Sequence, residues 1–162
     1  MEFAKKDFSY YWIIIRLPLL ALVLWSILSV IIARFAIQWH SSIFGTWQSM
    51  IIQLIVFGFI GYTIIAEHKG EVRHSAWGGA ITGVIVGFIG AILALIAFYF
   101  VPQMYEAGIQ QAVAQGAPEA TVRSFMKLGL YIGFVTGPLF SGLIGAGISA
   151  IAGVITKKVV KK

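Results

Sequence analysis

The sequence predicts an all-α integral membrane protein: a four-helix bundle in one domain, with a short amphipathic helical segment between the third and fourth helices. Three observations predict this class. Of the 162 residues, 59% are hydrophobic and only 11% are charged, whereas soluble domains carry about 25% charged residues. Four apolar segments approach or exceed the ~20 residues that a helix needs to cross a bilayer. Small residues also recur at every fourth position of the last two segments, a pattern typical of close helix contact in lipid.

The first span is expected over about residues 13–37. It follows a polar leader, residues 1–10, and is too long for a signal-peptide core, so we expect it to be retained. Arg16 and Arg34 bracket its most apolar part. The helix between them covers ~27 Å, which matches the thickness of the hydrocarbon region.

The second span is expected over about residues 48–66, with Gln53 as its strongly polar residue. We expect Gln53 to bond to another span, an interaction that contributes about 0.6 kcal/mol in membranes. Lining a polar pathway is the alternative role for this side chain. Gly58 and Gly61 predict close approach of a neighbouring helix near the other end of the span.

The connection after the second span, residues 67–75, has the densest charge in the chain and contains metal-ligand residue types. On a continuous helix, Glu67, Glu71 and His74 would share one face, with His68 nearby. Gly70 interrupts such a helix, and basic residues alternate with the acidic ones. The sequence therefore predicts a solvated loop and no metal site.

The third span is expected over about residues 76–101 and ends before Pro102. It carries a first strip of small residues, Gly79, Gly83 and Gly87. The following segment, residues 102–127, is predicted to form two short amphipathic helices outside the cytoplasm, broken around residues 115–118.

The fourth span is expected over about residues 128–156, with Pro138 producing a kink. It carries a second strip of small residues: Gly129, Gly133, Gly137, Ser141, Gly145, Ser149 and Gly153. We expect this strip to pack on the third span, with the first two spans as a lipid-facing wrap. Each step of four residues overshoots a turn by ~40°, so the strip turns roughly 240° over its length. Its two ends should therefore meet different neighbours.

The basic residues predict the orientation of the chain. With four spans, nine of the twelve Lys and Arg residues lie on the side of the termini and three on the other. This bias predicts an inner-membrane protein with both termini in the cytoplasm. The net charge of +6 is partly a C-terminal cluster, which we interpret as a lipid anchor and not as a nucleic-acid site. The anchor comprises Lys157, Lys158, Lys161 and Lys162.

The ionisable residues that ion transport and most intramembrane catalysis need are missing from the apolar interiors of the spans. The apolar interiors of the spans contain no Asp, Glu, Lys or His, and the chain has no Cys. Ion-coupled transporters and most intramembrane enzymes place an ionisable group in these interiors. Nucleotide-binding, metalloprotease and hydrolase motifs are also absent. We therefore predict no catalytic residues, no cofactor and no enzymatic activity.

The chain resembles a family of small bacterial four-span membrane proteins of unknown function. The likeness is one of layout together with the segment from about Phe98 to Lys158, which includes VPQMYEAGIQQAVAQGAPEATVRSF and ends in TKK. It implies an inner-membrane protein and no site residues. From the glycine strips we predict a structural or interaction component that associates with itself or with a larger membrane complex through helices 3 and 4. The alternative is a small oligomeric channel or facilitator.

Overall fold

The computed structural model describes residues 2–3 and 6–160. Its helices are α1 (Phe8–Phe35), α2 (Ile37–Ile43), α3 (Thr46–Ala66), α4 (Val72–Phe100), α5 (Gln103–Ala114) and α6 (Glu119–Val160). Among the described residues, α1, α3, α4 and α6 are long and apolar enough to cross a membrane. These four helices pack together, which confirms the predicted all-α class.

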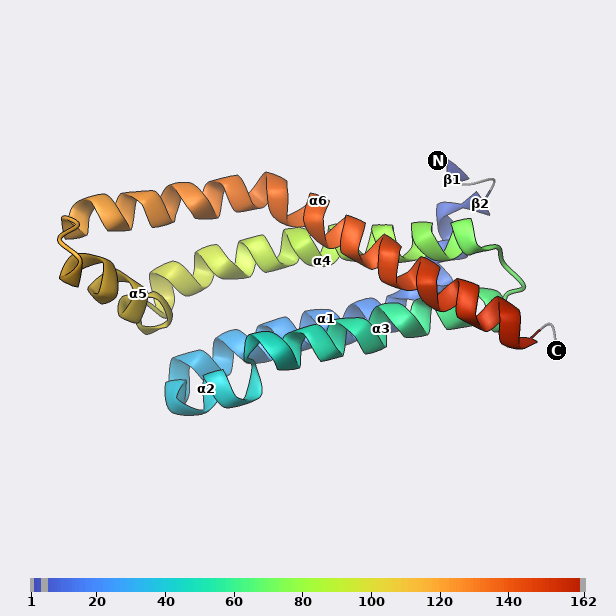
Figure 1. The fold of residues 1–162 in the computed structure, drawn as a ribbon, viewed down its shortest axis with the longest axis horizontal. Helices are drawn as coiled ribbons and strands as arrows, with labels where there is room; N and C mark the ends of the chain where they lie inside the picture. The colour runs from blue at the N-terminus through green and yellow to red at the C-terminus, as the bar shows by residue number, and fades with distance from the viewer. Residues whose placement is uncertain (1, 4–5, 161–162) are drawn as a thin grey trace.

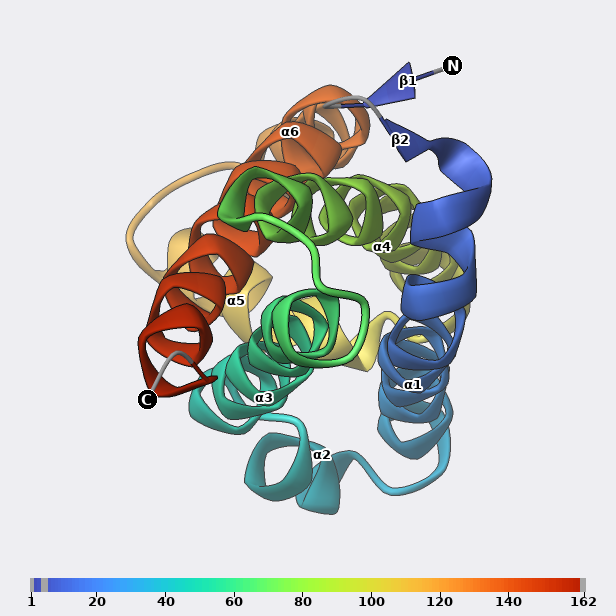
Figure 2. The ribbon, with the colours of Figure 1, turned by 90° about the vertical axis from the view of Figure 1, so that its right-hand side faces the viewer.

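The long helices lie side by side along the longest axis of the molecule (Figure 1). Both chain ends and the α3–α4 connection lie at one end, here called the terminal end. The short helices α2 and α5 lie at the opposite end, here called the α2–α5 end. Viewed from the terminal end, α6 passes across α4 and continues toward α3 (Figure 2). The fourth span therefore contacts two of the other three long helices.

The polar leader contains two short strands that the sequence did not predict. Strands β1 (Glu2–Phe3) and β2 (Lys6–Asp7) pair antiparallel. Asp7 then caps α1, because its carboxylate accepts a hydrogen bond from the Tyr10 backbone N–H at 3.1 Å. This cap satisfies one of the amide donors that a helix start leaves free.

Helix α2 was also not predicted. The chain leaves helical geometry at Ala36 and re-enters it for seven residues before α3. This short helix folds back on α1, where the rings of Phe44 and Trp25 lie 4.5 Å apart. The Ser29 hydroxyl on α1 and His40 Nε2 on α2 are hydrogen-bonded at 2.9 Å. Contacts far apart along the chain therefore stabilise a segment that shows no periodic pattern of its own.

The prediction of two separate short helices between the third and fourth spans is wrong in its second half. Helix α5 is separate, and the chain turns at Gly116, where φ is +94°. Helix α6, however, runs without interruption for 42 residues from Glu119, about nine residues before the expected span start. No Gly or Pro separates Glu119 from Leu128, so the helix continues through this stretch. At 1.5 Å per residue, α6 is ~63 Å long, about twice the hydrocarbon thickness.

The hydrophobic core is concentrated toward the terminal end. Its buried members come from α1 and α3: Ile14, Ile15, Leu22, Phe57, Ile60 and Ile64. Helix α3 is therefore not the lipid-facing wrap that its sequence suggested. Six of its residues, Gly61 among them, are buried against neighbouring helices.

Candidate functional site

Helices α4 and α6 touch backbone to backbone at the small residues of the two strips. A Cβ atom added to Gly79 would collide with the carbonyl oxygen of Gly145, and one on Gly83 with that of Ser141. A Cβ on Gly87 would lie 2.6 Å from Pro138 Cα. The expected contact between the third and fourth spans is therefore present, and these three glycines leave no room for any side chain.

The C-terminal part of the α6 strip contacts α3 in addition to α4. The fully buried Ser149 hydroxyl donates a hydrogen bond to the Phe57 carbonyl at 2.8 Å. A Cβ on Gly61 of α3 would collide with the Ser149 carbonyl oxygen. Farther on, a Cβ on Gly153 would lie 2.8 Å from the Ser75 hydroxyl. The strip thus gains α3 as a second neighbour along its length while it stays in contact with α4.

The N-terminal part of the same strip has no close neighbour. No atom of the described chain lies within 4 Å of a Cβ added to Gly129 or Gly133. A Cβ on Gly137 would approach only the Gly87 carbonyl, at 3.7 Å. Helix α6 changes direction midway, and its N-terminal half diverges from α4 (Figure 1). Pro138, which lacks a backbone donor, lies inside the helix and is buried at this level.

The divergence leaves a cleft in the half of the bundle nearer the α2–α5 end. It consists of two hollows of about 250 Å³ and about 370 Å³ that share four lining residues: Ser26, Gln53, Gly90 and Ala94. Helices α1, α3 and α4 line both hollows, α5 closes one, and the open part of the α6 strip forms a wall of the other. We call this space the Gln53 cleft. The volume of the larger hollow, about 370 Å³, lies in the range of small-molecule sites, ~300–1,000 Å³.

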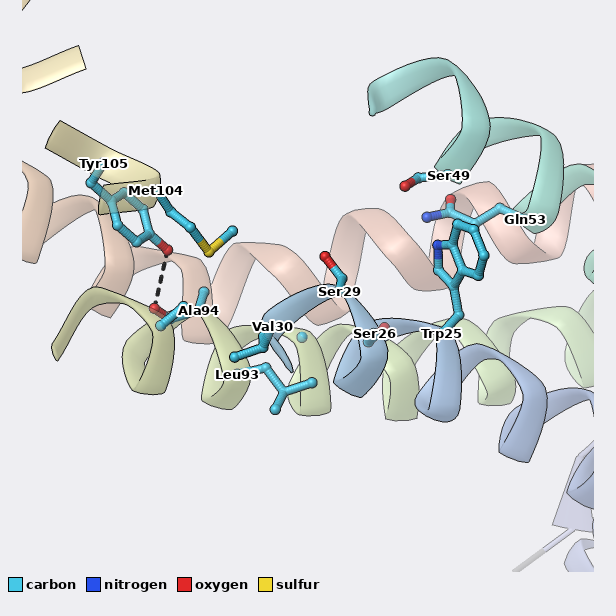
Figure 3. Close-up of a pocket in the computed structure, with 12 residues that line it drawn as sticks. Trp25, Ser26, Ser29, Val30, Ser49, Gln53, Leu93, Ala94, Met104 and Tyr105 are labelled. Carbon is cyan, nitrogen blue, oxygen red and sulfur yellow. Dashed lines mark hydrogen bonds between the residues drawn. The ribbon is translucent and has the colours of Figure 1, made fainter. Parts of the chain in front are cut away.

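Gln53 is the polar group with the most unused hydrogen-bonding capacity in this cleft. Its amide makes no hydrogen bond to any residue that the structure describes, so the predicted bond to another span is wrong. Figure 3 shows Gln53 grouped with Trp25 and Ser49. The two neighbouring hydroxyls already donate to backbone carbonyls, Ser26 to Leu22 at 2.9 Å and Ser49 to Phe44 at 3.5 Å. Of the α6 residues that line the same hollow, only Ser141 is polar, and no hydrogen bond joins it to Gln53.

Polar contacts from α5 and α2 shape the mouth of the cleft. The Tyr105 hydroxyl donates to the Ala94 carbonyl at 3.1 Å, which attaches α5 to α4 (Figure 3). Burial raises the pKa of Tyr105 and lowers the pKa of His40. The imidazole is therefore neutral at pH 7, and its bond to Ser29 is a neutral one. No carboxylate pairs with His40 among the described residues, so the third member of a catalytic triad is not in place.

Sequence analysis identified the small-residue wall and Gln53 but not the other polar lining. This lining comes from three helices: Trp25, Ser26 and Ser29 from α1, Ser49 from α3 and Tyr105 from α5. Isolated serines and aromatic residues are common in apolar helices, so none of them gives a local signal. The described lining residues include no charged side chain, in agreement with the uncharged span interiors.

The ionisable residues of the α3–α4 connection have structural roles. Glu71 and His74 form a capping box, in which the Glu71 backbone N–H donates to His74 Nδ1 at 2.9 Å. His74 is buried in the first turn of α4, whereas the sequence had placed it in a solvated loop. Glu71 also pairs with Arg73 at 2.8 Å. Within the described chain, no group of three or more ligand-type side chains is arranged to hold a metal ion.

The expected lipid anchor lies at the terminal end. Lys157 and Lys158 are exposed in the final turns of α6. Lys161 and Lys162, the other two members of the predicted anchor, lie outside the described residues. Exposed lysines next to an apolar helix can reach anionic headgroups.

Comparison of the chain with protein-family models, with curated proteins and with solved structures returned no match. The functional argument therefore rests on the geometry of the bundle alone. That geometry combines a packed half at the terminal end with an open, uncharged and partly polar cleft in the other half.

Proposed function

We propose that this protein is a non-enzymatic interaction component of the membrane, which holds a membrane-embedded partner in the Gln53 cleft. The observation that carries the proposal is the unequal packing of the α6 strip. Ser141, Gly145 and Ser149 are in close contact within the chain, whereas Gly129 and Gly133 face open space. Small residues permit close approach of another molecule in lipid, and here that capacity is unused.

The proposal includes an orientation and a location. Both termini and the α3–α4 connection lie in the cytoplasm, and the cleft opens in the outer half of the inner membrane. The support is the excess of Lys and Arg on the terminal side. The proposal involves no nucleic acid, because the C-terminal lysines adjoin an apolar helix and suit a lipid surface.

The alternative of a small oligomeric channel or facilitator receives no specific support. The residues that line the Gln53 cleft belong to the half of the bundle nearer the α2–α5 end. The terminal half is occupied by the hydrophobic core and by the close contacts of α6 with α3 and α4. This arrangement suits a binding surface better than a passage.

Photo-crosslinking in native membranes tests the proposed function. A diazirine amino acid replaces Gly129 in the cleft wall or, as a matched control, Gly147 on the same helix. Both positions have free space around a Cβ atom, but only Gly129 lines the cleft. We expect one enriched adduct at position 129 and bulk lipid at position 147. Bulk lipid in the same proportions at both positions would refute the proposal.

Two leucine substitutions separate binding from folding. Gly133→Leu fills the cleft and should abolish capture of the partner without lowering thermal stability, because the site is open. Gly145→Leu should destabilise the chain by about 1–3 kcal/mol through overpacking against α4 and Phe57. Thermal unfolding in detergent and the mass of the extracted complex measure the two effects. Equal loss of stability with unchanged capture at both positions would mean that the whole strip serves internal packing.

A further inference from the structure

We propose that the occupant of the Gln53 cleft is a neutral amphiphile, a molecule with one hydrocarbon chain and an uncharged hydrogen-bonding head. This inference rests on the proposed function, because it names the chemical class of the embedded partner. It follows from three properties of the cleft: its unused amide, its uncharged lining and its size.

The head group is determined by Gln53 and the nearby hydroxyls. A glutamine amide has two N–H donors and a carbonyl acceptor, and all are free of described protein partners here. Leaving an amide unpaired in an apolar medium is costly. The donor hydrogens of Ser26 and Ser49 are in use, but their oxygens still have room to accept. A hydroxyl or amide group can accept a hydrogen bond from the Gln53 amide and also donate one to these serine oxygens.

The lining excludes a charged head at this depth. Neither hollow has an Asp, Glu, Lys, Arg or His side chain among its lining residues. A buried ion without a partner is far more costly than a buried dipole. A free fatty acid or an amine would therefore keep its charge at the headgroup level and leave Gln53 unpaired.

The dimensions of the cleft favour a chain over a protein helix. One helical turn, ~5.4 Å long and ~10 Å across, occupies roughly 420 Å³, so hollows of about 250 Å³ and about 370 Å³ have room for only a small part of a spanning helix. A spanning helix of ~20 residues has more than five turns. A single alkyl chain is narrower and can lie along the small residues of two walls, beside Val86 and Leu130: Gly129, Gly133 and Gly137 on α6, and Gly87, Gly90 and Ala91 on α4.

The inference predicts selective labelling by a monoacylglycerol. The full chain is reconstituted in phosphatidylcholine nanodiscs with a diazirine-bearing monoacylglycerol, fatty acid, alkane or phosphatidylcholine of equal chain length. We expect the monoacylglycerol to label the cleft segments of α3, α4 and α6 at least tenfold more than each other probe. Excess unlabelled monoacylglycerol should suppress this labelling. Equal labelling by the alkane, the fatty acid or the phosphatidylcholine probe would overturn the inference.

Four variants locate the effect. Gln53→Leu removes the amide and Gly133→Leu fills the α6 wall, and each should reduce labelling at least tenfold. Gly147→Leu, an equally open position outside the cleft, should leave labelling unchanged. Gln53→Asn, which keeps the amide, should restore part of it. If all variants label like the parent chain, the amphiphile does not bind in this cleft. Gln53→Leu adds no bulk, so it keeps the test valid even where Gly133→Leu does not fold.

The outcomes separate the inference from the proposed function. If the adduct at position 129 in native membranes is a polypeptide, such as a second copy of this chain, the inference of an amphiphile is wrong but the proposed interaction function stands. If no species is enriched at position 129, both fail. An enriched neutral lipid there, together with loss of labelling in Gln53→Leu, supports both.

Discussion

At the scale of single residues, the effect of a glycine in this chain depends on what faces it. Gly79 lies against the backbone of Gly145, where even a methyl group collides. Gly58, one turn before the tightly packed Gly61 on α3, has no atom within 4 Å of an added Cβ. Sequence analysis treated Gly58 and Gly61 alike, as positions of close approach, and only Gly61 has this role.

This contrast predicts opposite outcomes for one substitution at two sites. Gly79→Ala should lower stability by about 1–3 kcal/mol, because the α4–α6 backbones must separate. Gly58→Ala should be neutral or stabilising by up to ~1 kcal/mol, since alanine is the better helix former. Thermal unfolding of both variants in the same detergent measures the difference. Similar losses at both positions would show that the space around Gly58 is occupied in the folded protein.

At the scale of helices, α5 is attached to the long helix α6 by an ion-pair cluster. The Arg123 guanidinium donates to both carboxylate oxygens of Glu106, at 3.1 and 3.2 Å, and to Glu119 at 2.8 Å. Hydrogen bonds from Gln110 and from Arg123 hold the pKa of Glu106 below its ordinary value of 4.5, against an opposing effect of burial. The cluster places α5 beside the mouth of the cleft.

Acidification should therefore loosen α5. Because the pKa of Glu106 is lowered in the folded protein, its stabilising effect is complete above 4.5 and is lost as pH falls through the lowered value. Spin labels on Gln111→Cys and Ser124→Cys, both exposed positions of a chain without cysteine, report the α5–α6 distance. We expect this distance to lengthen or broaden below pH 4.5. Glu106→Gln should show the broader distribution at neutral pH and little further change on acidification.

At the scale of the whole molecule, the bundle has two unlike halves. The terminal half contains the core and the contacts of α6 with α3 and α4. The other half contains the cleft, with α2 and α5 beyond it. The proposed orientation places the open half toward the outer leaflet, so the occupant would enter from that leaflet.

Cysteine accessibility tests this orientation. Glu67→Cys lies in the α3–α4 connection at the terminal end, and Gln115→Cys follows α5 at the opposite end; both parent residues are exposed. An impermeant maleimide added to intact cells should label position 115 only, and position 67 should react after the membrane is opened. Labelling of both positions in intact cells would contradict the four-span topology. Labelling of position 67 alone in intact cells would mean that the chain has the opposite orientation in the membrane.

The sequence by itself determined the class of this protein, its four long helices and the contact between the last two. These features depend on local properties: the length of an apolar run and the spacing of small residues along one helix. The drift of the strip around the helix predicted different neighbours at its two ends. This prediction holds only in part, because the C-terminal end keeps α4 while it gains α3, and the N-terminal end has no close neighbour.

Only the tertiary structure decided which parts of that strip are filled and which are open. Gly133 and Gly145 occupy equivalent positions in the repeat, yet one faces the Gln53 cleft and the other touches the backbone of α4. The difference arises where α6 bends near Pro138 and leaves α4, so it depends on the paths of two helices and not on either sequence. Gln53 also lacks its expected partner on another span: the α6 residues that line the same hollow are three glycines, Leu130 and Ser141, and no hydrogen bond joins Ser141 to Gln53.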